Sequence, residues 1–364
     1  MKEKIISVYV KGSRNSTAYY RIYQYLDRMP NVHVKYHIMY PKLIEHYFMP
    51  VSERNFIVKM IIWITALFRM TLALLNDCLS KPKSIIIHKR VISRYTPVII
   101  KFLLLLCKHY NIKIIWDFDD HLVEGRELTK RAFDFYSKIS DDIIVTHLFL
   151  KSLVNKAWQN KIIMMPTTDG DMYNEALKKD LLEERLRNLK NEVRLVWVAT
   201  SGNMVNLEYY IKYIEEAAKD IFLESKRKVL LYIVCDKPLK YPNNYLEINN
   251  IKWSRASAIR TMGLSHIGIM PLLDTEYNKG KGGFKLVQYM SYALPCIGSK
   301  VGFNNNVIDS SCGFLVSNGN DWIEAIKKLS IPSNWRNYSI GAFSKWNSDF
   351  SYEENLKKWN DLLN

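Results

Sequence analysis

Short apolar runs alternate with longer segments of helical periodicity along the whole chain. The short runs, rich in Ile and Val and bounded by polar residues, predict strands, and the periodic segments predict helices. The predicted strands cover residues 5–10, 32–38, 84–88, 112–116, 142–146 and 161–165, and then 194–199, 228–234, 246–248, 266–270, 295–299 and 313–316. Strands that alternate with helices are typical of parallel sheets covered on both faces, so the predicted fold class is α/β.

The two series of strands are separated by a polar, helix-prone stretch. With 364 residues, the chain exceeds what one hydrophobic core usually organises. We therefore predict two Rossmann-like domains, residues 1–170 and 193–339, connected by a linker or helix over residues 171–192. Ligands of such sheets bind beyond the carboxyl ends of the strands, so the residues that follow each strand are the first candidates for a site.

A long apolar segment, FIVKMIIWITALFRMTLALL, covers residues 56–75. It is long enough to span a bilayer, but Lys59 and Arg69 argue against a transmembrane span. Two alternatives stay open: a helix buried against the first sheet, and an amphipathic helix in a membrane interface with its cations toward the headgroups. The second alternative predicts peripheral contact with an anionic membrane through residues 56–75.

Residues 278–308 combine a basic, glycine-rich loop, an amphipathic helix, a short apolar strand and a second glycine turn. The candidate ligand-binding residues are Lys279, Lys281, Gly282, Gly283, Phe284 and Lys285. The glycines allow the backbone to approach an anion closely, and the lysines supply positive charge. The helix that follows directs its N-terminal N–H groups to the same place, so this order of elements predicts a diphosphate site.

The spacing Gly-Phe-Lys-Leu-x-Gln-Tyr-Met, followed by Ala-Leu-Pro, an apolar strand and Val-Gly, is uncommon among glycine-lysine loops. It resembles the donor-site signature of retaining GT-B glycosyltransferases of family 4, the group 1 glycosyl transferases. Looser similarity extends over RLVWVATSGNMVNLEYY and LSHIGIMPLLDTEYNKGK, and in the first half over YYRIYQYL, IIWDFDDHL, DDIIVTHLFLKSL and KIIMMP. The resemblance implies the GT-B fold, in which two Rossmann-like parallel-sheet domains face each other across a cleft. It implies an acceptor-side first domain, joined by a C-terminal helix at about 340–364, and a nucleotide-sugar-binding second domain.

The chain departs from the family signature at two glutamate positions. Gln288 stands where the family has a glutamate that typically binds the ribose hydroxyls, and Gly280 stands where another glutamate lies near the donor sugar. An amide still hydrogen-bonds a diol, although without charge. The sugar contact then falls to backbone groups or to neighbours such as Asp274 and Glu276, and the resemblance leaves the base and the sugar of the donor open.

Further donor contacts are expected at the ends of other strands. Thr200, Ser201 and Gly202 follow the strand 194–199. Their N–H and hydroxyl groups are candidates for binding a phosphate oxygen, for capping the next helix, or for both. Trp253 follows another strand and is a candidate for lining the base pocket, with a place in the core as its alternative.

In the first domain, Gly12 follows the first strand and Arg21 opens the helix after it. Both are candidates for the donor site, because they lie at the carboxyl edge of the predicted sheet. Arg21 suits contact with the diphosphate or with an anionic acceptor. A surface ion pair is the alternative for this residue.

Asp117, Asp119 and Asp120 cluster after the predicted strand 112–116. The resemblance places a residue that touches the donor sugar near Asp119. Asp119 and Asp120 are therefore the candidate catalytic residues of this domain, and Lys285 is the candidate of the other. Three carboxylates also suit a metal ion, but the resemblance implies that lysines and a helix dipole neutralise the diphosphate, so no metal and no other cofactor are expected.

The formal net charge of +16 requires anionic partners. The basic residues scatter over both halves and form no recognisable nucleic-acid module, so we expect no nucleic acid. A nucleotide diphosphate, a lipid-linked phosphate acceptor and an anionic inner leaflet would each use the same charge. Five cysteines without metal-ligand spacing, and an N-terminus without a recognisable signal peptide, indicate a cytoplasmic location, with peripheral contact at the inner face of the membrane as an option.

These observations and the resemblance together predict a glycosyltransferase. It is expected to move a sugar from a nucleoside-diphosphate-sugar to a glycan or lipid-linked acceptor, in the synthesis of a surface polysaccharide or glycoconjugate. Retention of the anomeric configuration is implied by the resemblance alone. Two alternatives stay open: a nucleotide-sugar epimerase on the same fold, and a non-catalytic basic binding protein.

Overall fold

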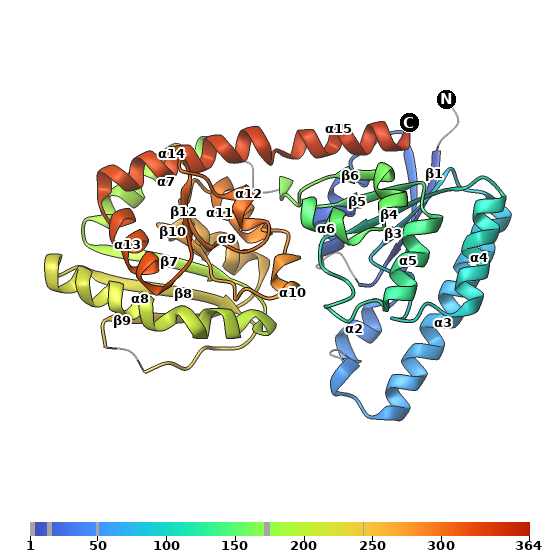
Figure 1. Ribbon diagram of the computed structural model, residues 1–364, viewed down its shortest axis with the longest axis horizontal. Coiled ribbons are helices and arrows are strands. Elements are labelled where there is room, and N and C mark those ends of the chain that lie inside the picture. The colour runs from blue at the N-terminus through green and yellow to red at the C-terminus, as the bar shows by residue number, and fades with distance from the viewer. Residues whose placement is uncertain (1–3, 13–16, 49–50, 171–174, 243) are drawn as a thin grey trace. The chain divides into compact units, whose positions relative to one another are not determined.

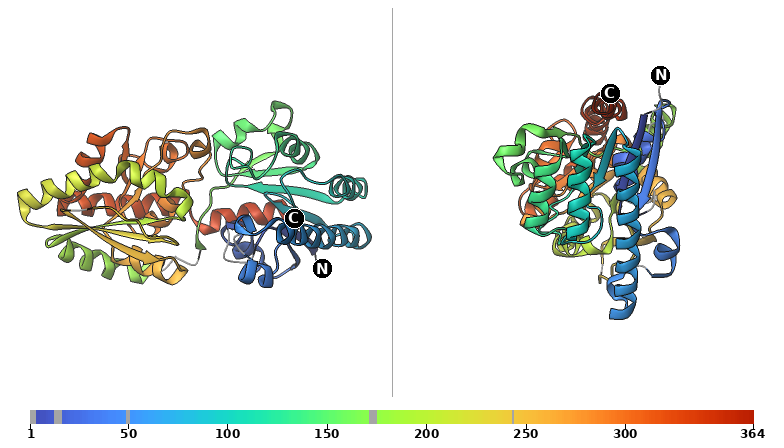
Figure 2. Two further views of the ribbon diagram at one scale, coloured as in Figure 1. Left: turned by 90° about the horizontal axis from the view of Figure 1, so that it is seen from below. Right: turned by 90° about the vertical axis from the view of Figure 1, so that its right-hand side faces the viewer.

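The computed structural model describes residues 4–12, 17–48, 51–170, 175–242 and 244–364 (Figure 1). The chain divides into two compact units, each built on its own parallel sheet (Figure 2). The first unit comprises Met1–Thr167 and Glu353–Asn364, and the second comprises Thr168–Tyr352. The chain thus leaves the first unit three residues before the expected boundary at 170 and returns to it later than the expected position near 340. Residues 171–174 of the expected linker lie outside the described residues.

The first unit has a six-stranded sheet with the order β2-β1-β3-β4-β5-β6, and each neighbouring pair is parallel. Its strands are β1 (Lys4–Val10), β2 (Val32–Ile38), β3 (Ser84–His88), β4 (Lys113–Phe118), β5 (Asp142–Val145) and β6 (Ile162–Met164). The central strand β3 is buried over its whole length. A strand covered by helices on both faces has no exposed side, which explains the continuous apolar run of Ile85, Ile86 and Ile87.

Helices cover both faces of this sheet (Figure 1). They are η1 (Tyr19–Tyr23), α1 (Gln24–Leu26), α2 (Lys42–Phe48), η2 (Val51–Glu53), α3 (Phe56–Ser80), α4 (Val98–His109), α5 (Lys130–Ile139), α6 (Leu148–Leu153), η3 (Lys156–Lys161) and α15 (Tyr352–Leu363). Helix α3 starts at Asn55, whose side chain accepts a hydrogen bond from the N–H of Val58 at 2.9 Å. It continues to Ser80 and is therefore longer than the apolar segment 56–75 that predicted it.

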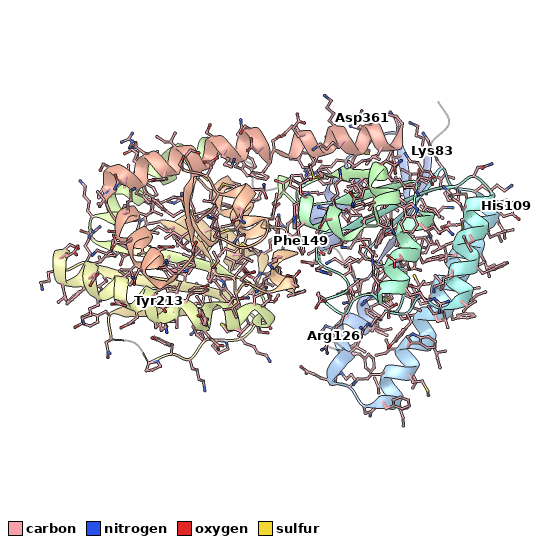
Figure 3. The ribbon with its side chains drawn as sticks, viewed as in Figure 1. Lys83, His109, Arg126, Phe149, Tyr213 and Asp361 are labelled. Atoms are coloured by element: carbon pink, nitrogen blue, oxygen red, sulfur yellow. The ribbon has the colours of Figure 1, made fainter. Side chains whose placement is uncertain are left out.

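The C-terminal helix α15 packs into the first unit. The indole nitrogen of Trp359 donates to the carbonyl oxygen of Arg21 at 3.1 Å, and the Asn355 amide donates to the carbonyl of Pro166 at 2.7 Å. Lys83 donates to the carbonyl of Leu363 at 2.8 Å, and Figure 3 shows Lys83 beside the end of this helix. The end of the chain therefore completes a unit whose other residues precede Thr168.

The second unit has the strand order β12-β11-β10-β7-β8-β9, again parallel throughout. Its strands are β7 (Glu192–Val198), β8 (Lys228–Cys235), β9 (Leu246–Lys252), β10 (Ile267–Met270), β11 (Cys296–Ser299) and β12 (Gly313–Val316). Its helices are α7 (Glu175–Leu189), η5 (Ser201–Asn203), α8 (Met204–Ser225), α9 (Arg255–Leu264), α10 (Glu276–Lys279), α11 (Phe284–Ser291), α12 (Asn304–Val307), α13 (Gly319–Leu329) and α14 (Pro332–Asp349). Two buried tryptophans, Trp322 and Trp335, anchor α13 and α14 on the sheet.

Each predicted strand corresponds to a strand of the described residues, and the α/β fold class is confirmed. β9 was expected to end at residue 248 but continues to Lys252. The difference that bears on the candidate site concerns β4, which was expected to end at Trp116 but continues to Phe118. Asp117 therefore lies inside a buried strand and not in the loop after it. A carboxylate is tolerated there because Arg21 and His88 both bind it.

Candidate functional site

The glycine-rich loop of the second unit ends where α11 begins. Gly283 caps this helix with φ of +61°, and a Cβ at this position would lie 3.0 Å from Val307 and 3.1 Å from Phe303. Glycine adopts this left-handed conformation without strain, whereas other residues do not. The cap residue offers no side chain to the first turn, so the positive end of α11 faces the loop that carries Gly282.

A second glycine holds the loop from the other side. Gly302 has φ of +54°, and a Cβ there would lie 2.5 Å from the carbonyl oxygen of Lys279. The turn after β11 therefore packs directly on the backbone of α10. From the same strand, the Ser299 hydroxyl accepts a hydrogen bond from the N–H of Leu272 at 2.8 Å. The segment that leads into the glycine-rich loop is thus fixed to the end of β11 at two points.

Lys279 and Lys281 are held by partners of the same loop. The Nζ atom of Lys279 lies 2.7 Å from Glu276 and 3.6 Å from Asp274, and the hydrogen bond with Glu276 raises the pKa of the lysine. The Nζ atom of Lys281 donates to the Tyr277 hydroxyl at 3.0 Å and lies 4.2 Å from the centre of its ring. Both ammonium groups carry their charge at the loop surface, where an anion would compete with these partners.

Lys285 has a different environment. Its Nζ atom donates to Gln288 Oε1 at 2.8 Å, and Gln288 Nε2 donates to Asp169 at 3.2 Å. Arg255 donates to both oxygens of the same carboxylate at 2.9 and 3.2 Å. Burial lowers the pKa of Lys285 to about 8, while Asp169 raises it and Arg255 lowers it further. An ammonium group that is costly to keep charged gains more than a solvated one from an anionic ligand.

Gln288 is only 3% exposed, and both ends of its amide are used in this network. The oxygen accepts from Lys285 and the nitrogen donates to Asp169. In this arrangement the side chain orients the lysine. A ribose contact, as the sequence predicted for Gln288, would require the amide to exchange one of these partners.

The loop after β7 meets an acidic side chain. The N–H of Ser201 donates to Asp236 at 2.6 Å, and its hydroxyl donates to the other carboxylate oxygen at 2.7 Å. Burial acts to raise the pKa of Asp236, but the Ser201 hydrogen bonds lower it below its usual value. Ser201 therefore binds a carboxylate of its own chain where the sequence predicted a ligand phosphate. Thr200 and Gly202 are exposed beside it, and the position of a Cβ on Gly202 is open.

Trp253 follows β9 at the carboxyl edge of the sheet. Its backbone N–H donates to the carbonyl of Cys235 at 3.0 Å, which fixes its position relative to β8. The side chain is 39% exposed. The core alternative for this tryptophan is therefore wrong, and its ring is accessible at the edge where the other candidates lie.

In the first unit, Arg21 belongs to a buried cluster. Its Nε donates to Asp117 at 2.8 Å, and its Nη1 donates to the Met165 carbonyl at 2.9 Å and to Thr167 at 3.0 Å. Burial acts to raise the pKa of Asp117, but the charge of Arg21 and the hydrogen bond from His88 at 2.7 Å hold it below its usual value. The expected role of Arg21 in ligand binding is corrected: its guanidinium neutralises a buried carboxylate.

The two candidate catalytic carboxylates share one lysine. The Nζ atom of Lys89 lies 2.8 Å from Asp119 and 2.8 Å from Asp120. The side chain of Asp119 is 10% exposed and that of Asp120 is 29% exposed, so Asp120 is the more accessible of the two. Gly12 lies at the end of β1, and a Cβ on it would lie 2.6 Å from the carboxylate of Glu45, which makes it a close approach between loop and helix.

The sequence and the fold of the chain are similar to those of known proteins. Residues 192–330 match the family model described as Glycosyl transferases group 1. This segment of the second unit is therefore a group 1 glycosyl transferase domain. The resemblance read from the loop and helix at 278–308 is thereby confirmed, and the matched segment covers most of the second unit. No curated protein matches the sequence.

The solved structures show that the chain has the GT-B fold over its full length. Sucrose-phosphate synthase from Thermosynechococcus elongatus superposes with a TM-score of 0.63 and 13% identity, covering 99% of this chain and 98% of that one. HepE from Anabaena in complex with UDP gives 0.65 and 9% identity, with 99% of each chain covered. A UDP-GlcNAc 2-epimerase from Methanocaldococcus jannaschii gives 0.53 and 12% identity, with 99% of each chain covered.

The sequence did not reveal the residues that hold the glycine-rich loop in place. Asn206 Oδ1 accepts hydrogen bonds from the N–H of Leu273 and from the Asn278 amide, both at 2.9 Å, and both asparagines are buried. Asp169 and Arg255, which organise Lys285, were also missed. A buried polar residue carries no periodic signal, so only Arg255, directly after a strand and a capping serine, could have been suspected from the sequence.

Proposed function

We propose that this glycosyltransferase moves a sugar from a nucleoside-diphosphate-sugar to a glycan or lipid-linked acceptor, in the synthesis of a surface polysaccharide or glycoconjugate. The observation that carries the proposal is the convergence of three features at one end of α11. The Gly282–Gly283 loop allows close approach of an anion, the positive end of the helix faces it, and the half-buried ammonium of Lys285 lies on the first turn.

The donor diphosphate is assigned to this end of α11, with Lys285 as its principal cation. Lys279 and Lys281 add charge at the loop, and the backbone at Phe284 lies in the first turn. Thr200, Gly202 and Trp253 are proposed contacts of the donor nucleotide at neighbouring strand ends. Support for a nucleotide-sugar donor comes from Anabaena HepE, which has been solved with UDP, with UDP and glucose, and with UDP-glucose.

The proposed chemistry needs no strong protein base. The bond between the anomeric carbon and the diphosphate oxygen breaks, and the acceptor oxygen bonds to the same carbon from the same face. The acceptor proton passes to the departing phosphate oxygen, which gives retention of configuration. Lys285 and the dipole of α11 stabilise the negative charge that develops on the leaving group. Asp120, with Asp119 beside it, is proposed to contact hydroxyl groups of sugar or acceptor.

We further propose that the reaction uses no metal ion and no other cofactor. Among the described residues, no group of three or more His, Cys, Asp and Glu side chains is arranged to hold a metal. We assign the neutralisation of the diphosphate to Lys279, Lys281 and Lys285 of the protein. A cytoplasmic location is proposed as well, with peripheral membrane contact through residues 56–75 if the acceptor is carried on a lipid.

A thermal-shift screen with nucleoside diphosphates and their common sugars, with and without magnesium, tests the donor site first. A ligand at one hundred times its Kd stabilises the folded state by about 2.7 kcal/mol, which raises Tm by roughly 5 °C or more. Lys285→Met should remove the shift, whereas Lys212→Met, an exposed lysine of α8, should leave it unchanged.

The screen also separates the alternatives. A shift that persists in Lys285→Met contradicts the assignment of the diphosphate to α11. Conversion of the donor sugar without an acceptor would favour the epimerase. The chain superposes on the epimerase structure with a lower TM-score than on sucrose-phosphate synthase and HepE. The absence of any shift with all donors would favour the non-catalytic binding protein.

A further inference from the structure

Helix α3 carries two apolar stripes, and only one of them is buried. Ile62, Ala66, Met70 and Leu74 recur every four residues and are buried, and the last three pack into the core of the first unit. The second stripe consists of large apolar residues spaced by three or four positions, all of them exposed: Ile57, Ile61, Ile64, Phe68, Leu72, Leu75 and Leu79. Their exposed fractions range from 42% to 83%. An unbroken stripe of this length on a surface helix marks a binding face.

Helix α4 extends the apolar surface. Val98, Phe102 and Leu105 repeat with the same spacing and are 81%, 57% and 50% exposed. Their helix packs against α3, where the Sγ atoms of Cys78 and Cys107 lie 3.4 Å apart. The two helices run side by side on one face of the sheet (Figures 1 and 2). His109 marks the end of α4 in Figure 3. We call the outward apolar residues of both helices the α3–α4 face.

Basic residues outnumber acidic ones in the segment that carries the α3–α4 face. Between residues 42 and 113 the sequence has twelve Lys and Arg and three Asp and Glu. Four of these cations pair with acids outside the segment, namely Lys89, Arg90, Lys108 and Lys113, and eight remain. The single acidic residue of the two helices, Asp77, is buried and accepts hydrogen bonds from Ser7 and Tyr9 at 2.7 Å each. Arg69 and Lys101, each next in the sequence to an exposed phenylalanine of this face, are therefore not neutralised by acids on their own helices.

A self-complementary contact with a second copy would bring these like charges together, which is unfavourable. A spanning helix is excluded on other grounds. By length and composition α3 could cross a membrane, but its buried stripe and Asp77 fix it to the sheet. An anionic bilayer satisfies both observations, because the apolar stripe enters the acyl region while lysine and arginine reach the headgroups.

We propose that the α3–α4 face docks the protein on an anionic lipid bilayer, with both helices lying in the interface plane. The proposal extends the contact expected at residues 56–75 to a second helix and to a defined side of α3. It does not depend on the identity of donor or acceptor, because it uses no residue of the donor site.

The test is co-sedimentation of the full chain with vesicles of phosphatidylcholine containing phosphatidylglycerol, and with vesicles of phosphatidylcholine alone. The wild type should bind the anionic vesicles, and more weakly as salt is raised. Ile61→Ser, Phe68→Ser and Leu72→Ser combined should weaken the partition by about tenfold or more. The matched control, Leu223→Ser with Ile340→Ser, changes residues of the second unit that are 54% and 53% exposed and should bind as the wild type does.

A second variant, Arg69→Glu with Lys101→Glu, keeps the apolar stripe and reverses two charges. It should lose the preference for anionic vesicles while retaining the wild-type Tm. The proposal is overturned if the wild type does not bind anionic vesicles, if the triple variant binds as well as the wild type, or if light scattering shows a dimer that the triple variant dissociates. Donor binding, measured by thermal shift without vesicles, should be the same in all variants. A failure of the membrane proposal can therefore be distinguished from a failure of the proposed function.

Discussion

The pKa of Lys285 predicts a pH dependence of donor binding. With a pKa of about 8, roughly nine tenths of this lysine is protonated at pH 7 and about one tenth at pH 9. The protonated form is the cation, so the affinity for a nucleoside diphosphate is present below pH 8 and is lost as the pH rises through it. If only the protonated form binds, the Kd increases by about tenfold between pH 7 and pH 9, equal to about 1.4 kcal/mol.

The assay is titration calorimetry with the nucleoside diphosphate that gives the largest thermal shift. The terminal phosphate ionises near pH 6, so the charge of the ligand is nearly constant above pH 7 and the inflection reports on the protein. Lys285→Arg supplies a cation that does not lose its proton in this range, so its Kd should show no inflection near pH 8.

Asp169→Asn provides a sharper test of the network. The Asp169 carboxylate raises the pKa of Lys285, so its removal should shift the inflection to lower pH, which a purely structural role would not do. The positive charge of Arg255 lowers the pKa of Lys285, so Arg255→Met should shift the inflection to higher pH. A wild-type Kd that stays constant from pH 7 to pH 9, or an inflection that survives in Lys285→Arg, would refute the assignment of Lys285 as the principal cation.

Three further predictions concern the framework of the two units. Arg21→Met leaves the buried carboxylate of Asp117 without its main countercharge and should lower the free energy of unfolding by about 3–5 kcal/mol; a urea titration that matches the wild type would contradict this role. Gly302→Ala introduces a Cβ against the Lys279 carbonyl at a positive φ and should cost about 1–3 kcal/mol, seen as a lower Tm with weaker donor binding, whereas an unchanged Tm would show that the turn relaxes. Asn206→Ala leaves the N–H of Leu273 without its acceptor and should destabilise by about 1–3 kcal/mol; faster amide exchange should be confined to the donor loop, and exchange like that of the wild type would rule out the bracing role.

The sequence predicted the sheets well and the site only in part, for a physical reason. Strands such as Ile85–Ile87 are buried on both faces, so their apolar runs are visible without knowledge of any partner. The glycines at 283 and 302 were visible because a positive φ restricts the residue type locally. The fold and the glycine-rich loop could therefore be predicted from the sequence.

Hydrogen bonds and ion pairs between residues far apart in the sequence could not be predicted. Arg21 binds Asp117, 96 positions away, and Gln288 binds Asp169, 119 positions away. Nothing in the local sequence distinguishes an arginine that reaches a ligand from one that neutralises a buried carboxylate. The predicted end of β4 was wrong for the same reason. An aspartate in the sequence suggests that the strand has ended, unless the residues that bind the aspartate are known.

The return of α15 to the first unit bears on how the protein is made. The ribosome releases the N-terminal residues first, yet the indole of Trp359 and the amide of Asn355 supply contacts that the first unit needs. The sheet of that unit is complete in sequence by Met164, but its last helix is synthesised only after the entire second unit has emerged. During translation the surface of the first unit that α15 covers therefore stays exposed until the second unit has been made. In a chain cut short before residue 353, that surface would remain exposed to chaperones and proteases.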